Sequence, residues 1–222
     1  MQNNDARNEI MASIRQNLAK SLPFDAVHGE HHAHQETPKS AATVSLDLPI
    51  NTLTKSFQES LVAIGGNCTI VANISEATAV VQTIIDKAQA KRIAISDSDL
   101  VLEVSKSLKT ESDILQNASA KMLFETDLGI TSAQFGIAET GTLVLESDRE
   151  FHRLTSLVPP IHVCLLKAET IKQTLGETLE ILEKDLSRTV TFITGPSRTS
   201  DIELTLAIGV HGPAELHVII VE

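Results

Sequence analysis

The sequence predicts an α/β fold, in which helices cover a largely parallel, buried sheet. From residue 50 onward, segments with helical spacing of apolar residues alternate with short aliphatic runs of strand character. The length of 222 residues suits one domain with an extra arm, and a domain of this size can bury roughly 70% of its unfolded surface. Because the chain has no Trp or Tyr and only six Phe, we expect a core of Ile, Leu, Val and Ala.

Residues 1–49 are predicted to form an N-terminal arm that precedes an α/β domain over residues 50–222. Apolar residues four positions apart predict a helix over residues 5–20. A helix this short is marginal alone in water, so we expect it to dock on its own domain or, alternatively, on a partner. Residues 21–49 are broken by Pro and Gly and have no periodic pattern, which predicts a linker.

The linker contains four closely spaced histidines, His28, His31, His32 and His34. Imidazole is a ligand of several transition metals, so this cluster could capture one. No neighbouring cysteine completes a known ligand spacing, however, and we expect no functional metal site here.

Helices and strands alternate over the first half of the domain. A predicted helix from about residue 50 ends at Gly65-Gly66, because glycine favours the conformation that follows a helix C-terminus. Ser75 is the expected N-cap of the second helix, with Glu76 at its positive end. The strands are expected over residues 68–72, 92–96 and 119–124, and the second and third helices over about 75–90 and 99–108.

Asp97 and Ser98 follow the predicted strand over residues 92–96 directly. They could serve a ligand or the N-cap of the next helix, and the residue types favour the cap.

The second half begins with a predicted β-hairpin, whose strands over 135–139 and 142–146 flank a turn at Thr140-Gly141. Apolar patterns then predict a strand over 161–166, a helix over 168–184, and strands over 189–193, 202–208 and 216–221.

Charge and cysteine usage exclude several classes of function. The formal net charge is −11, and no Lys/Arg-rich run offsets it, so we expect no nucleic-acid binding. Cys68 and Cys164 lie in apolar runs and are predicted to be buried free thiols, and two thiolates cannot hold an ordinary four-cysteine iron–sulfur cluster. The absence of a signal-peptide pattern and of a long apolar run predicts a cytoplasmic protein without membrane insertion.

The first candidate site is the predicted hairpin turn. Glu139 could act there as a general base or a nucleophile beside the hydroxyl of Thr140. Gly141 permits a positive φ and the close approach of a ligand. The alternative, which the residue types favour, is a turn whose polar side chains are simply solvated.

The second candidate is the mixed-charge segment 148–153. Arg149 and Arg153 could hold a carboxylate or phosphate through paired hydrogen bonds, and His152 could transfer a proton. A solvated surface loop is the alternative, and the residue types favour it.

The third candidate is the segment 195–203, which follows the strand over 189–193. Gly195-Pro196 predicts a bend, and ligands of open α/β sheets usually bind beyond the carboxyl ends of the strands. Hydroxyl, cationic and acidic side chains therefore meet where a site is expected.

Arg198 is the expected anion anchor of this segment, and Ser197 and Thr199 would add hydroxyl contacts. Asp201 would orient Arg198 or a substrate hydroxyl. In a second turn, His211 could act as an acid, a base or a hydrogen-bond donor. The alternative is a turn stapled by an Arg198–Asp201 pair.

Four sequence blocks, in this order and spacing, resemble the lactate-utilisation (LUD-domain) family, in particular its C-type members. The blocks are residues 136–145, 157–163, 192–203 and 209–218. The resemblance implies a three-layer α/β sandwich like that of ribose-phosphate isomerase and CoA-transferases. It also implies a role in oxidising L-lactate to pyruvate, together with two iron–sulfur partner proteins that carry the clusters.

The chain departs from the family pattern after the hairpin. Family members commonly carry a Gly/Asn-rich turn there, whereas this chain has the charged segment 148–153. We therefore do not expect backbone amides to cradle an anion at that loop.

Three functional hypotheses follow. In the first, the chain is a subunit of a cytosolic iron–sulfur-dependent system that oxidises L-lactate, and it binds no cofactor itself. Arg198, with Arg149, would hold a small carboxylate, while Glu139 or His211 handles protons. The second hypothesis is a standalone transferase or isomerase that acts on acyl or sugar-phosphate substrates. The third is a non-catalytic assembly or regulatory module of the same pathway.

Overall fold

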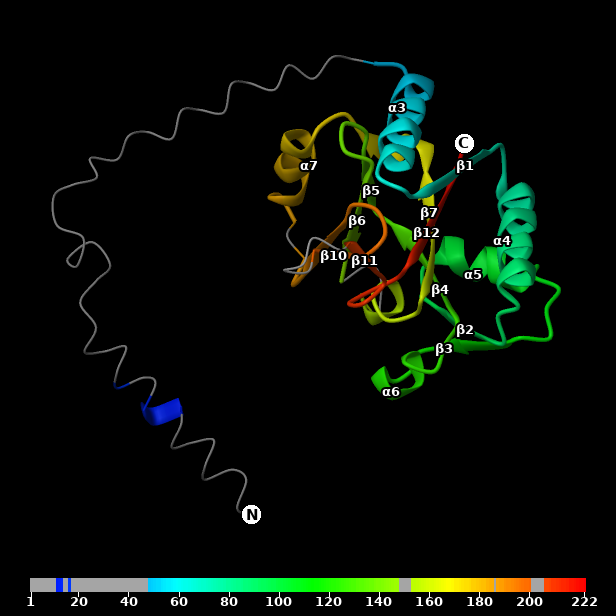
Figure 1. Cartoon of the computed structure of the whole chain (residues 1–222). Coiled ribbons are helices and arrows are strands. Elements are labelled where there is room, and N and C mark those ends of the chain that lie inside the picture. The colour runs from blue at the N-terminus through cyan, green and yellow to red at the C-terminus, as the bar shows by residue number, and fades with distance from the viewer. Residues whose placement is uncertain (1–10, 14–15, 17–47, 148–152, 186, 201–205) are drawn as a thin grey trace, which may run out of the picture. The chain divides into compact units, whose positions relative to one another are not determined.

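The computed structural model describes residues 11–13, 16, 48–147, 153–185, 187–200 and 206–222 (Figure 1). The chain divides into two units, Met1–Ala42 and Thr43–Glu222. In the first unit, residues 11–13 and 16 are helical, and the rest of the helix predicted over residues 5–20 lies outside the described residues. The linker histidines His28, His31, His32 and His34 also lie outside them. Within the described residues, no helix combines the length and apolar character needed to cross a membrane.

The second unit is built on a sheet of six parallel strands. Their spatial order is β1-β12-β7-β4-β2-β3, and each neighbouring pair runs parallel. The C-terminal strand β12 thus lies beside β1, the first strand of the unit. The bounds are β1 Asn67–Val71, β2 Arg92–Ile95, β3 Asp113–Gln116, β4 Leu128–Ala133, β7 Ile161–Lys167 and β12 Glu215–Val221.

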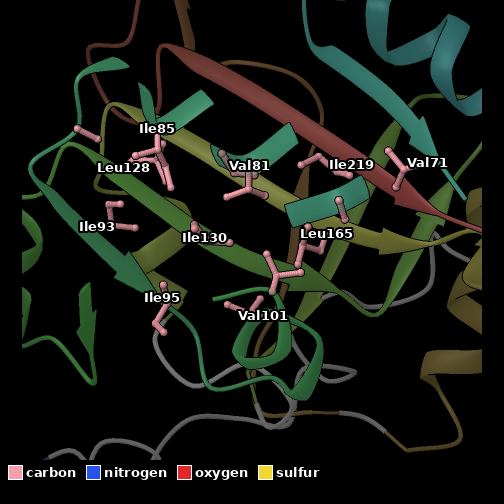
Figure 2. Packing of buried hydrophobic residues seen from close by; sticks show 14 residues of the cluster. Val71, Val81, Ile85, Ile93, Ile95, Val101, Leu128, Ile130, Leu165 and Ile219 are labelled. Atoms are coloured by element: carbon pink, nitrogen blue, oxygen red, sulfur yellow. The ribbon is translucent and has the colours of Figure 1, made fainter. Parts of the chain in front are cut away.

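Two helices, α4 (Ile74–Ala88) and α5 (Asp99–Lys106), pack against one face of this sheet. Figure 2 shows the aliphatic layer between them, in which Val81 and Ile85 of α4 and Val101 of α5 meet Ile130 and Leu165 of the strands. Burying a side chain of this size contributes roughly 1.5–3 kcal/mol. The layer confirms the predicted aliphatic core.

A helix and a second sheet pack against the other face. Helix α3 (Ile50–Ala63) contributes Phe57 and Leu61 to an apolar cluster with Leu143, Leu166 and Ile220. The second sheet has the order β8-β5-β6-β9, with bounds β5 Phe135–Ile137, β6 Thr142–Glu146, β8 Ile171–Lys172 and β9 Val190–Ile193. The hairpin of β5 and β6 is antiparallel, as predicted.

Helix α7 (Leu175–Leu182) packs on the opposite face of that second sheet. Its Leu182 contacts Ile137 and Val144, whose side chains point away from those of Leu143 and Leu145 because successive strand residues alternate. The layered arrangement of helices and sheets confirms the predicted α/β sandwich.

Local signals set most helix ends. Helix α3 stops where Gly65 has φ +87° and the Gly66 N–H donates to the Leu61 carbonyl at 3.0 Å, as expected from the glycine pair. The Val101 N–H donates to the Ser98 hydroxyl at 3.4 Å, which confirms Ser98 as the cap of α5.

The predicted N-cap of α4 at Ser75 is wrong. Asn73 is the cap, and its side chain accepts the Glu76 N–H at 3.0 Å. The Glu76 carboxylate in turn accepts the Ala72 N–H at 3.0 Å. This reciprocal pair starts the helix two residues before the predicted position.

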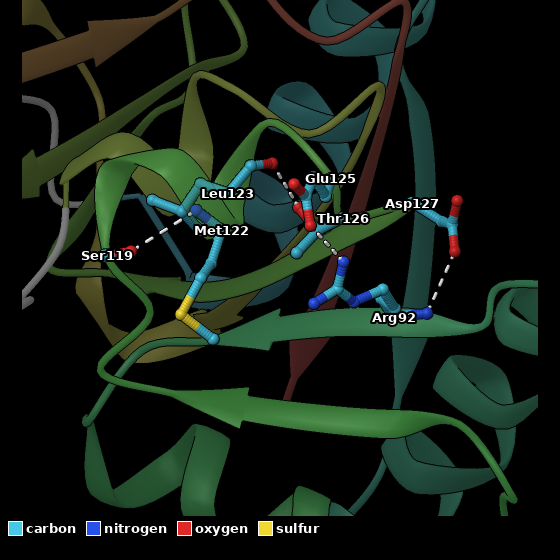
Figure 3. A network of polar contacts seen from close by, with 7 residues as sticks. All are labelled: Arg92, Ser119, Met122, Leu123, Glu125, Thr126 and Asp127. Atoms are coloured by element: carbon cyan, nitrogen blue, oxygen red, sulfur yellow. Dashed lines mark hydrogen bonds and ion pairs between the residues drawn. The ribbon is translucent and has the colours of Figure 1, made fainter.

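The strand predicted over residues 119–124 is wrong, and Figure 3 shows the reason. Ser119 accepts the Met122 N–H at 3.4 Å and caps the short helix α6 (Ala120–Leu123). Only Leu123 of that helix is buried, while Phe124 is 78% exposed. The strands of this region are β3 and β4 on either side of it, and neither was predicted.

A carboxylate joins β2 to the start of β4 in the same region. Asp127 accepts the Arg92 N–H at 2.9 Å, and the Arg92 guanidinium contacts Glu125 at 2.6 Å (Figure 3). These contacts orient the chain as it leaves α6 and enters β4.

The helix predicted over residues 168–184 begins later than expected. Residues 168–170 form a 3-10 turn, and Ile171 and Lys172 pair with β5 as strand β8. Thr174 caps α7 by accepting the Glu177 N–H at 3.2 Å. Ile171 fits the helical spacing of the later leucines, but it belongs to strand β8, and its side chain is buried there.

Gly141 provides a test of the packing between the hairpin and α3. It has φ +65°, and a Cβ there would lie 2.4 Å from the Leu61 backbone nitrogen. Gly195 has a similar φ of +82°, but its nearest neighbour would be the Ile64 side chain at 3.2 Å. Gly141→Ala should therefore cost about 3 kcal/mol of unfolding free energy, and Gly195→Ala about 1 kcal/mol. Urea unfolding of both variants measures the difference, and equal costs would contradict the close approach.

Candidate functional site

A cavity of about 410 Å³ lies where the two sheets meet. Its walls come from the end of the 3-10 turn η1 (Arg153–Ser156), the start of β7, residues 192–198 and the turn 211–213. His162 and Leu216 are the second residues of β7 and β12, so the cavity lies at the amino ends of these strands. It also follows the carboxyl end of β9, but β9 pairs antiparallel with β6 in the second sheet. The predicted site therefore does follow the carboxyl end of a strand. That strand, however, belongs to the second sheet and not to the parallel sheet.

Backbone hydrogen bonds hold the two predicted turns together. The Ser197 N–H donates to the Pro213 carbonyl at 2.8 Å, and the Gly209 N–H donates to the Ser197 carbonyl at 3.0 Å. Beyond Ser197 the chain continues as β10 (Arg198–Ser200), which pairs antiparallel with β11 (Leu206–Ile208). The predicted bend thus ends at Ser197, and Thr199 lies in a strand and is not among the residues that line the cavity.

Arg198 lines the cavity with an exposed side chain. Its guanidinium donates to the carbonyl of Ile64, the C-terminal cap residue of α3. A cation at this end of a helix is favourable, because the helix dipole is negative there. A guanidinium carries five N–H groups, and within the described part of the chain the others meet no acceptor. The contact with Ile64 holds Arg198 against the end of α3, whereas the alternative partner Asp201 lies outside the described residues.

His211 and Ser197 face the same cavity as Arg198. His211 is exposed, and Ser197 is half-buried. The structure thus brings together a cation, a hydroxyl and an imidazole that the sequence predicted as site residues. Arg149 and Asp201 lie outside the described residues, so their predicted roles stay predictions.

The hairpin turn lies beside this cavity without lining it. The Glu139 carboxylate is exposed and accepts the N–H of Leu175, the first residue of α7, at 2.7 Å. The hydroxyl of Thr142 bonds those of Thr140 at 2.7 Å and Thr194 at 2.8 Å. Thr194 does line the cavity, so a chain of three hydroxyls joins the turn to the wall of the site.

His162 is a site residue that the sequence analysis missed. Its side chain is fully buried and lines the cavity, and its Nε2 lies 2.8 Å from the Thr131 hydroxyl. Its Nδ1 is buried and has no hydrogen-bond partner among the described residues. Burial, and to a smaller extent the charge of His217, lowers the pKa of His162 to about 3. The signal in the sequence is a histidine inside an otherwise apolar strand.

A second cavity of about 670 Å³ lies against α4 on the opposite face of the parallel sheet. Cys68 and His217 line it together with Lys87. Burial raises the pKa of the Cys68 thiol to about 12, so the unreactive thiol form prevails there. Cys164 is fully buried, and Cys68 is half-buried. The first cavity combines the exposed guanidinium of Arg198 with His162, whose buried Nδ1 lacks a partner among the described residues, and it is the candidate site.

Among the described residues, no group of three or more His, Cys, Asp or Glu side chains is arranged to hold a metal ion.

Curated relatives match less than half of this chain, and the chain spans less than half of their length. An uncharacterised protein of Neisseria meningitidis is 45% identical over 93 residues, 40% of each chain. A protein of Anoxybacillus flavithermus named lactate utilization protein C is 36% identical over 96 residues, 43% of this chain and 44% of that protein. The Bacillus subtilis protein of the same name is 33% identical over 103 residues, 44% and 43% of the two chains.

The fold is similar to that of a solved structure. The crystal structure of a DUF162 family protein from Deinococcus radiodurans has a TM-score of 0.62 and covers 79% of this chain and 99% of that chain. The two are 23% identical, and at this level the likeness shows the fold alone. The family model of the LUD domain matches residues 54–221. Because that match includes both sheets and every segment of the cavity, we conclude that this chain belongs to the LUD domain family.

Proposed function

We propose that this chain is the substrate-binding subunit of a cytoplasmic iron–sulfur-dependent system that oxidises L-lactate to pyruvate. The observation that carries the proposal is the cavity in which Arg198, Ser197 and His211 meet, since this set suits a small hydroxy acid. The relatives named lactate utilization protein C support lactate as that acid.

The proposed roles follow from the contacts of each side chain. Arg198 binds the carboxylate through the N–H groups that Ile64 leaves unused, and Ser197 adds a hydroxyl contact. Oxidation of lactate to pyruvate releases two electrons and two protons. His211 takes up the proton of the substrate hydroxyl, and the C2–H bond breaks with its proton passing to water. The two electrons pass one at a time to iron–sulfur clusters on partner proteins. We propose that the clusters lie on partners, because Cys68 and Cys164 cannot supply four thiolate ligands.

A reconstituted system tests this role. Lactate-dependent dye reduction by the iron–sulfur partners should require this chain, and Arg198→Lys should raise the lactate concentration for half-maximal rate about 10- to 100-fold, because a paired contact to a carboxylate is lost. Lys87→Gln is the matched control, since it changes a cation that lines the opposite cavity. Equal rates with and without the chain would refute the proposal.

Glu139 is proposed to support α7 instead of transferring a proton, because its carboxylate caps the helix outside the cavity. Glu139→Gln retains an oxygen that can accept the Leu175 N–H, so it should keep both stability and activity. Glu139→Ala removes the acceptor and should cost about 1 kcal/mol of unfolding free energy. A loss of lactate oxidation in a stably folded Glu139→Gln protein would instead identify Glu139 as catalytic.

His162 should make stability depend on pH. Its pKa is 6.5 in the unfolded chain and about 3 in the folded one, so the unfolded state binds the proton more readily. The resulting stabilisation is complete above pH 6.5 and is lost as the pH falls toward 3, by about 2 kcal/mol between pH 6.5 and 5. Urea unfolding of the wild type and His162→Gln across this range measures the effect. The variant should show a shallower slope, and identical slopes would contradict a buried neutral histidine.

A further inference from the structure

One ring nitrogen of His162, at the candidate site, makes no hydrogen bond to the described residues. His162 is fully buried and is among the residues that line the cavity. Its Nε2 is paired with Thr131 at 2.8 Å, whereas its Nδ1 is buried without a partner among the described residues. A buried polar atom that lacks a hydrogen bond costs about 1–3 kcal/mol. Because His162 belongs to the residues that line the cavity, a bound ligand is a candidate for the missing partner.

The Thr131 hydroxyl selects the tautomer of this ring. Thr131 is 2% exposed, and His162 is the hydrogen-bond partner that the described residues provide for its hydroxyl. If Thr131 donates to Nε2, its hydroxyl proton is used, and the ring proton sits on Nδ1. If instead Nε2 carries the proton and donates to Thr131, the hydroxyl proton and Nδ1 are both left unpaired. The first arrangement leaves one buried group unsatisfied and the second leaves two, so the first is favoured.

Burial also fixes the charge of the ring. A low pKa keeps His162 neutral across the physiological pH range, so its free group is an uncharged N–H donor. His217 on the far face of the sheet adds to the effect of burial and disfavours a positive charge on the ring. The ring is thus suited to donate one hydrogen bond, and it is not suited to accept a proton from a substrate.

We propose that the Nδ1–H of His162 donates a hydrogen bond to an acceptor oxygen of a small carboxylic acid bound in this cavity, and that Thr131 is the positioning residue that holds the donor tautomer. The inference deepens the proposed function, on which its substrate class rests. A carboxylate or carbonyl oxygen accepts such a bond fully. The site should therefore bind a 2-oxo acid at least as tightly as the corresponding 2-hydroxy acid.

Nitrogen-15 NMR of the full chain tests the tautomer without any partner protein. The chain has eight histidines, and the His162 signals are assigned by their loss in His162→Gln. At pH 7 the wild type should show a protonated Nδ1 and an unprotonated Nε2. Thr131→Val should lose this preference and Thr131→Ser should restore it, while Thr78→Val, which removes a buried hydroxyl from α4, should not change it. A protonated Nε2 in the wild type would overturn the proposal.

Titration with pyruvate, L-lactate and acetate then tests the ligand. Pyruvate should shift the Nδ1 signal, and Thr131→Val should weaken its binding about 3- to 10-fold. Pyruvate binding that leaves the His162 signals unchanged would refute the donor role while leaving the proposed function intact. A shift with acetate alone would support the donor role and count against lactate as the substrate. If none of the three acids shifts the signal at millimolar concentration, the donor role is refuted.

Discussion

The site depends on the pairing of β12 between β1 and β7. That pairing places Leu216 next to His162 and is anchored at its start by the Pro160 carbonyl, which accepts the Ala214 N–H at 2.9 Å. The turn 211–213 immediately precedes this anchor and binds Ser197, so the register of one strand fixes the cavity. A slip of one residue would exchange the two faces of β12 and place His217 in the apolar layer that Leu216 now fills. The C-terminal strand therefore both completes the core and forms the site.

Helix α3 supports the opposite side of the same region. Its last carbonyl holds Arg198, and its backbone at Leu61 lies against Gly141 of the hairpin. The hairpin is in turn joined to the cavity wall through Thr142 and Thr194. In the sequence, Gly141 was interpreted as part of a possible ligand-binding turn. In the structure, it allows the hairpin to pack closely against the backbone of α3 at Leu61. Membership of the LUD domain family defines the fold, whereas the proposed chemistry is argued from the side chains that line the cavity.

The sequence predicted the position of several elements that are set by residues close to them in the chain. The glycine pair after α3, Ser98 before α5 and the hairpin around Gly141 were predicted because each signal lies within a few residues of its effect. Two errors had local causes, because Asn73 instead of Ser75 caps α4 and Ser119 caps a short helix where a strand was predicted. The other errors arose where pairing across the fold decided the outcome. Ile171 fits a helical pattern but pairs with Gly136, and residues 190–193 belong to the second sheet. His162 was missed because a polar residue in an apolar strand acquires meaning only through its neighbours Thr131 and Leu216.

The proposed function requires that a small acid binds where β7 and β12 begin. A crystal structure of the full chain with pyruvate would show whether it does. We expect a carboxylate held by Arg198 and Ser197, with a ligand oxygen roughly 3 Å from Nδ1 of His162. Pyruvate bound instead in the cavity lined by Lys87 and His217, with the Arg198 site empty, would contradict it.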